Sequence, residues 1–128
     1  MPFINVKLNA EESEELREKV ASIVLDNTSD ILNKKRDVTS VLVEFIPRNN
    51  WCIGDKKAIT FYLDIKITKG TNTKDQKSNY IKAMYGDLRN LIGEINAASY
   101  IVLDEVEADA WGFEGLTQEF RYIQSKKI

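Results

Sequence analysis

The first apolar residues of the chain alternate with polar ones. Ile4, Val6 and Leu8 are spaced two apart with polar residues between them, which is the pattern of a strand with one buried face. Residues 3–8 are therefore predicted to form a strand that begins almost at the first residue.

A helical pattern follows this strand. From residue 11 to about residue 34 the apolar side chains recur at helical spacing, and several glutamates precede them where the helix dipole is positive. A β-branched apolar run over residues 41–46 then ends at Pro47 and predicts a second strand. A crossover helix usually joins parallel strands, so this half of the chain is predicted to be a β-α-β unit.

The same order of elements is repeated in the second half. A strand is predicted over residues 59–67, an amphipathic helix over 75–96 and a closing strand over 100–106. The segments between the strands of each half have equal length, so a difference of 59 in residue number is expected to hold through the helix. Trp51 and Trp111 follow the two closing strands with a difference of 60, so one residue has been added to the second half by that point.

The duplication predicts the fold class. Two pseudo-symmetric β-α-β units favour an α+β fold in which a four-stranded mixed sheet has both helices on one face. Residues 1–128 are expected to form a single domain from halves of about 1–57 and 58–128. Association of chains would cover the other face of the sheet, so we expect an oligomer with apolar C-terminal residues at its contacts. The pattern also fits a ferredoxin-like monomer.

Composition restricts the chemistry. The chain has 18 Lys and Arg against 20 Asp and Glu, so there is no global field to attract nucleic acid or an anionic membrane. It has no histidine and one cysteine, Cys52, which excludes histidine bases and an internal disulfide. No stretch is apolar enough to span a bilayer, and the first residues lack the pattern of a signal peptide. We expect a cytoplasmic protein without a metal site or an organic cofactor.

Pro2 is the first candidate for catalysis. It follows the initiator methionine, and removal of Met1 would expose a secondary amine at the start of the first strand. An amino terminus titrates at about 8, and both burial and nearby cations favour its neutral form, so this amine would be a base near neutral pH. The alternative is that Pro2 merely permits the removal of Met1.

Pro2, the duplicated unit and residues 43–54 together resemble the tautomerase superfamily. Members similar to 4-oxalocrotonate tautomerase have an N-terminal proline and a valine-rich strand that runs into an aromatic-Gly-Ile-Gly turn. Trp51-Cys52-Ile53-Gly54 matches this turn, with Cys52 in place of a glycine. The resemblance implies a trimer of fused β-α-β pairs, in which each proline pocket borrows residues from a neighbouring chain. It also implies a small 2-oxo or enol acid as the substrate.

In such chemistry the neutral proline moves a proton while cationic side chains hold the carboxylate. The arginines that the family places after the first strand and early in the second strand are absent, and Ser40 or Leu42 stands at the second position. Lys34 lies seven residues before Val41, like the pocket lysine of relatives resembling macrophage migration inhibitory factor. The other candidate cations for the substrate are Lys35, Arg36, Arg48, Lys69, Lys74 and Arg121. For each of them the alternative is a solvated surface charge.

The aromatic residues receive different roles. The resemblance implies that Trp51 is an apolar wall that desolvates the proline, and the alternative is packing in the core or at an interface. Trp111 and Phe113 stand at the equivalent point of the second half, where no proline terminus exists. They are expected to have structural or intersubunit roles.

The resemblance favours a cofactor-independent tautomerase or isomerase with Pro2 as the general base. Decarboxylation or hydration of a small acid within the same superfamily is one alternative. A trimeric binding protein without catalysis is the other, because both arginines are missing. The expected partners are a small carboxylate and two further copies of the chain, and neither nucleic acid nor a membrane.

Overall fold

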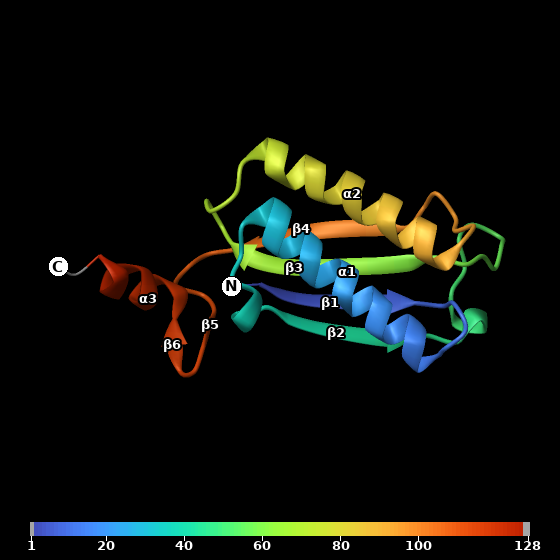
Figure 1. The fold of residues 1–128 in the computed structure, drawn as a ribbon, viewed down its shortest axis with the longest axis horizontal. Helices are drawn as coiled ribbons and strands as arrows, with labels where there is room; N and C mark the ends of the chain where they lie inside the picture. Colours follow the sequence, from blue (N-terminus) through green and yellow to red (C-terminus); the bar gives the residue numbers. More distant parts are fainter. Residues whose placement is uncertain (1, 127–128) are drawn as a thin grey trace.

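A four-stranded mixed sheet with two helices on one face forms the body of the protein in the computed structural model, which describes residues 2–126 (Figure 1). The strand order is β2-β1-β3-β4, and the central pair β1 and β3 is antiparallel while the outer pairs are parallel. The bounds are β1 Phe3–Leu8, α1 Glu14–Leu32, β2 Ser40–Phe45, β3 Phe61–Thr68, α2 Lys74–Ile92 and β4 Tyr100–Val106. The predicted α+β fold class is confirmed.

Side-chain caps decide where the two long helices begin. The Ser13 hydroxyl accepts a hydrogen bond from the backbone N–H of Leu16 at 3.0 Å, and Thr73 forms a reciprocal capping box with Gln76. At the other ends the chain turns through Asn33 and Gly93, which have positive φ angles of 60° and 107°. Both predicted helices were therefore too long, because the chain turns at Asn33 and Gly93, before the predicted ends at about residue 34 and at residue 96.

The added residue of the second half lies before its helix. The caps Ser13 and Thr73 already differ by 60 in residue number, whereas the buried positions of β1 and β3 differ by 59. The prediction that a difference of 59 holds through the helix was wrong. The extra residue lies in the turn after β3, where Gly70 has a φ of 84° that suits the longer connection.

The core lies between the helices and one face of the sheet. Alternate residues of β1 and β3 are buried there against one side of each helix, as the periodicity predicted. The fully buried hydrophobic residues are Ile4, Val6, Leu8, Val20, Val24, Leu32, Phe61, Leu63, Ile65, Ile67, Tyr80, Met84 and Leu88. The opposite face of the sheet has no covering element in the described residues and exposes Leu42, Tyr100 and Val102 among charged side chains.

One buried hydrogen bond joins the two helices. The hydroxyl groups of Thr28 and Tyr80 lie 2.9 Å apart, both residues are 0% exposed, and burial raises the pKa of the Tyr80 hydroxyl well above its ordinary value. Tyr80→Phe should lower the free energy of unfolding by about 1–3 kcal/mol, because the Thr28 hydroxyl loses its partner. Adding Thr28→Val should recover much of this loss. Chemical denaturation measures both, and a double variant less stable than Tyr80→Phe would contradict the assignment.

A C-terminal extension follows the sheet. The hairpin β5 (Gly112–Phe113) and β6 (Leu116–Thr117) leads into α3 (Gln118–Ser125). Figure 1 shows this extension beyond the end of the sheet, beside the N-terminus. These elements were not predicted, because each is too short for a clear period. In residues 2–126 no helix is long and apolar enough to cross a membrane.

Candidate functional site

Pro2 lies directly before β1, at the end of the sheet from which the C-terminal extension projects. It is buried, and its carbonyl oxygen accepts a hydrogen bond from the N–H of Ser40 at 3.2 Å. This bond links the backbone of Pro2 to the first residue of β2, and Pro2 also precedes β1 directly. Two neighbouring strands therefore fix the position of Pro2. Met1, whose removal the sequence analysis expects, lies outside the described residues.

A cavity of about 640 Å³ opens at Pro2. Phe3, Val38, Trp111 and Phe113 give it apolar walls, and β5 of the C-terminal hairpin forms one side. Its other lining residues are Asp37, Thr39, Ser40, Lys66 and Gly112. We call this cavity the Pro2 pocket. A largely apolar pocket disfavours the charged form of an amine, which suits a base that must be neutral.

Trp111 reaches the Pro2 pocket because of the antiparallel pairing of β1 with β3. That pairing places Lys66 opposite Phe3, so the end of β3 lies level with Pro2. The indole Nε1 of Trp111 donates to Thr68 Oγ1, the last residue of β3, at 3.1 Å. Trp111 and Phe113 were expected to be structural or intersubunit, and both line the Pro2 pocket of their own chain. The duplication was the signal that could have predicted this position of Trp111 and Phe113. When the first strands of the two halves pair antiparallel, the end of β3 lies beside the start of β1.

Lys66 is a pocket-lining cation that the sequence analysis missed. Its Nζ lies 2.7 Å from Asp104 Oδ2 and 3.3 Å from Asp64 Oδ2. The hydrogen bond to Asp104 outweighs partial desolvation and raises the pKa of Lys66, so this side chain is protonated at neutral pH. The alternation of residues in β3 predicted only that Lys66 lies on the solvated face of the sheet. No local sequence pattern distinguished Lys66 from other surface lysines.

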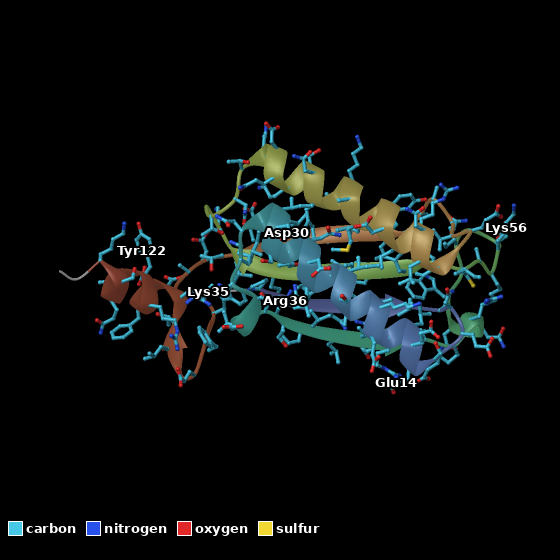
Figure 2. All side chains as sticks on the ribbon, in the orientation of Figure 1. Glu14, Asp30, Lys35, Arg36, Lys56 and Tyr122 are labelled. Carbon is cyan, nitrogen blue, oxygen red and sulfur yellow. The ribbon has the colours of Figure 1, made fainter. Side chains whose placement is uncertain are left out.

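A second cavity, of about 760 Å³, adjoins the Pro2 pocket, and both are lined by Val38 and Phe113. Four of the candidate cations line it, namely Lys34, Lys35, Lys69 and Arg121. Figure 2 shows Lys35 at the end of the sheet from which the C-terminal extension projects. We call this cavity the cationic groove. The structure thus brings these predicted cations to one side of Pro2.

The cations of the groove differ in their partners. Lys69 Nζ lies 3.1 Å from Glu107 Oε1, and both side chains are well exposed. Arg121 lies over the Phe113 ring at 3.7 Å, donates to the Phe113 carbonyl at 3.0 Å and pairs with Glu114 at 3.3 Å. Arg121 therefore supports the wall of the Pro2 pocket, and part of its charge is already balanced.

Lys34 is the half-buried cation of the groove. The left-handed residue Asn33 ends α1 and turns the chain, after which Lys34 Nζ donates to Thr71 Oγ1 at 2.8 Å. Among residues 2–126 no carboxylate lies within ion-pair distance of Lys34. Burial lowers the pKa of Lys34, while the more distant Glu105 opposes this shift. Lys34 is therefore well suited to receive the carboxylate of a ligand.

Trp51 and Arg48 lie at the opposite end of the chain's own sheet. Both follow β2, whose last residue Phe45 pairs with Leu8, whereas Pro2 precedes the first residue of β1. The length of β1 separates them from Pro2 by roughly 17 Å. Lys56, in the loop that follows Trp51, lies at this far end in Figure 2. Within one chain, Trp51 and Arg48 do not line the Pro2 pocket.

Comparison with known proteins decides the family. Residues 2–58 match the family model described as Tautomerase enzyme. Probable tautomerase K2 of Dickeya dadantii (strain 3937) is 35% identical over 54 residues, which are 42% of this chain and 81% of that protein. The chain belongs to the tautomerase family. The tautomerase model matches the β-α-β unit that carries Pro2, so the resemblance seen in the sequence is confirmed.

Solved structures extend the likeness of this tautomerase-family protein to both halves of the chain. Pt0534 inactivated by 2-oxo-3-pentynoate has a TM-score of 0.85 and 12% identity, covering 93% of this chain and 98% of that one. A fused 4-OT asymmetric trimer has a TM-score of 0.84 and 14% identity, with the same coverage. A macrophage migration inhibitory factor-like protein from Entamoeba histolytica has a TM-score of 0.78 and 20% identity, covering 91% of this chain and 97% of that one. These structures share the fold of paired β-α-β units.

Proposed function

We propose that this tautomerase moves a proton within a small 2-oxo or enol acid, with the amine of Pro2 as the general base after Met1 is removed. The observation that carries the proposal is that the cationic groove lies beside the Pro2 pocket, because Val38 and Phe113 line both. In the proposed complex the reacting carbon of the acid lies at the amine and its carboxylate points toward Lys34. Membership of the tautomerase family supports this type of reaction.

The proposed proton transfer follows from the surroundings of Pro2 in its pocket and of Lys34 in the cationic groove. The apolar walls formed by Phe3 and Trp111 favour the neutral form of the amine. The neutral amine takes a proton from the carbon or oxygen of the bound acid and returns it at another atom. Lys34 holds the carboxylate and stabilises the negative charge of the intermediate. The proton leaves and returns through Pro2, so the proposed reaction uses no cofactor.

Intact mass and turnover on one sample test the proposal. The mass of the purified protein shows whether Met1 has been removed. Processed protein should convert phenylenolpyruvate to its keto form. 2-Oxo-3-pentynoate, which inactivates a protein of the same fold, should stop this reaction and add its mass to the peptide that begins with Pro2. Processed protein that shows neither turnover nor labelling would overturn the proposal.

Lys34→Gln should lower kcat/KM by about 10–100-fold, chiefly by raising KM, because it removes a charge-assisted hydrogen bond to the carboxylate. Lys35→Gln is the matched control, since Lys35 is the next residue, lines the same groove and is exposed. It should change kcat/KM by less than about threefold. Steady-state kinetics with phenylenolpyruvate measure both, and equal losses would show that Lys34 has no special role.

The depressed pKa of Lys34 adds a pH dependence. A lysine binds a carboxylate strongly only while it is protonated, and burial lowers the pKa of Lys34 from its ordinary 10.5. The apparent affinity for the substrate should therefore fall as the pH rises through a value below 10.5. In Lys34→Gln this alkaline loss of affinity should disappear, and its persistence would assign it to another group.

We also propose a homotrimer. The sheet face opposite the helices exposes Leu42 and Tyr100, and α3 exposes Phe120, Tyr122 and Ile123, so apolar surface is available for contacts. A fused 4-OT of the same fold is a trimer. In an assembly Trp51 and Arg48 would contribute to the Pro2 pocket of a neighbouring chain, which they do not line in their own. Light scattering should give three times the chain mass of 14.7 kDa, and a monomer would contradict the proposal.

A binding protein without catalysis is the second candidate. No arginine lines the Pro2 pocket in the described residues, and Lys66 is already paired with two aspartates. A protein of this kind would bind phenylpyruvate at the Pro2 pocket without turning over phenylenolpyruvate. The same assay, together with a binding titration, separates the two functions.

A further inference from the structure

Two buried hydrogen-bond donors of α3 are unpaired. The Nε2 nitrogen of Gln118 and the Nε nitrogen of Arg121 are both buried, and neither has an acceptor in the part of the chain that the structure describes. Buried N–H groups in folded proteins are nearly always hydrogen-bonded, so each unpaired donor needs an explanation. Both residues line the cationic groove, where a bound ligand can supply the missing acceptor.

The residues that carry these donors are bonded to the walls of the Pro2 pocket. The backbone N–H of Gln118 donates to the carbonyl oxygen of Trp111 at 3.0 Å. The guanidinium of Arg121 donates to the carbonyl oxygen of Phe113 at 3.0 Å. Trp111 and Phe113 are aromatic walls of the Pro2 pocket. The two unpaired donors therefore belong to the side of the cationic groove that adjoins Pro2.

The donors lie on one face of α3. The residues of this helix that line the groove are three or four positions apart, which places them on the same side, and they are Gln118, Arg121, Tyr122 and Ser125. The exposed residues Phe120 and Ile123 fall on the other side of the helix. Contacts between chains through Phe120 and Ile123 therefore leave the unpaired donors facing the groove.

A 2-oxo or enol acid has an acceptor where this arrangement requires one. Its α-oxygen is attached to the carbon that joins the carboxylate to the reacting carbon. In the proposed complex the carboxylate points toward Lys34 and the reacting carbon lies at Pro2, so the α-oxygen lies between the groove and the Pro2 pocket. When the amine takes a proton from the reacting carbon, the electron pair of the C–H bond forms the enolate double bond and the negative charge moves to the α-oxygen. Return of the proton to that carbon restores the carbonyl group.

We propose that the Gln118 amide and the Arg121 Nε–H donate hydrogen bonds to the α-oxygen of the bound acid and stabilise the enolate. The inference rests on the proposed function for the position of the acid. Donors that are already in place stabilise a developing oxyanion more than they stabilise the neutral carbonyl, and this difference accelerates the reaction. Gln118 is then a catalytic residue. Arg121 supplies one donor while its Nη2 group holds Phe113 and Glu114.

Gln118→Met tests the proposal, because it removes the donor and keeps the length of the side chain. It should lower kcat for phenylenolpyruvate by about 10²-fold, as removal of one oxyanion donor does elsewhere, and raise KM by less than about tenfold. The larger effect is expected on kcat because the α-oxygen carries its full charge only in the enolate. Gln124→Met is the matched control at an exposed residue of α3 and should leave both constants unchanged.

Calorimetric titration of two ligands gives a readout that is independent of turnover. Phenylpyruvate has the α-oxygen, whereas hydrocinnamate has the same ring and carboxylate without it. The processed protein should bind phenylpyruvate about three- to tenfold more tightly than hydrocinnamate, the usual contribution of a hydrogen bond. Gln118→Met should lose this preference and keep its affinity for hydrocinnamate.

The outcomes separate this inference from the proposed function. Turnover that depends on Pro2 and is unchanged in Gln118→Met would overturn the inference and leave the proposed function intact. An equal loss of affinity for both ligands in Gln118→Met would also overturn it, because that result indicates a structural role. A preference for phenylpyruvate that disappears in Gln118→Met, in protein without turnover, would support the donors and count only against the reaction at Pro2.

Discussion

Protein in which another residue precedes Pro2 is expected to convert phenylenolpyruvate about 10²- to 10⁴-fold more slowly than the processed protein, the usual contribution of a general base. The nitrogen of Pro2 is then an amide, whose lone pair is delocalised and not basic. Pro2 remains in place in such protein, so the pocket loses the base without losing the ring. The measurement is kcat/KM on the processed protein and on a version extended at its N-terminus by one residue.

Two substitutions, Pro2→Ala and Pro47→Ala, test the same assignment of the general base. Pro2→Ala keeps an amino terminus but loses the ring that holds the nitrogen at the start of β1, and it should cost at least about tenfold, because misplaced groups catalyse poorly. Pro47→Ala changes the other proline of the chain, which follows β2 at the far end of the sheet. It should alter kcat/KM by less than about twofold. An extended protein as active as the processed one would show that the amine is not the base.

Gly112→Ala is expected to lower kcat/KM by about 10–100-fold with little change in the unfolding of the core. A Cβ atom at Gly112 would lie 2.7 Å from the carbonyl carbon of Leu116, so the backbone of β5 and β6 must move apart. This hairpin forms one side of the Pro2 pocket and carries Phe113. A displacement of about 1 Å in such a wall is enough to lose a hundredfold in rate.

Gly86→Ala is the matched control for this substitution. Gly86 lies within α2, and no atom lies within 4 Å of the position that a Cβ would take. Alanine there should raise the free energy of unfolding by about 0.5–1 kcal/mol and leave turnover unchanged. Kinetics and thermal unfolding of both variants provide the comparison. If Gly112→Ala retains full activity, the hairpin is not a functional wall of the pocket.

The sequence by itself determined the two long helices, the four strands of the main sheet, the duplication and the position of Pro2, but not the short C-terminal elements β5, β6 and α3. Strands β1 and β4 begin and end at the residues that alternation predicted, and the class of paired β-α-β units followed from their order. Periodicity succeeds here because it records which face of an element is buried, and burial dominates the stability of each element. It failed at the helix ends and at the added residue, where caps and a glycine turn decide the path.

Only the tertiary structure decided which aromatic residues surround Pro2. Trp51 and Trp111 stand at equivalent places in the two halves, and nothing in the local pattern distinguishes them. The antiparallel pairing of β1 with β3 brings Trp111 to Pro2 and sends Trp51 to the other end of the sheet. Alternating hydrophobicity gives the buried face of a strand but not its partner, because pairing depends on contacts between residues that lie far apart in the chain.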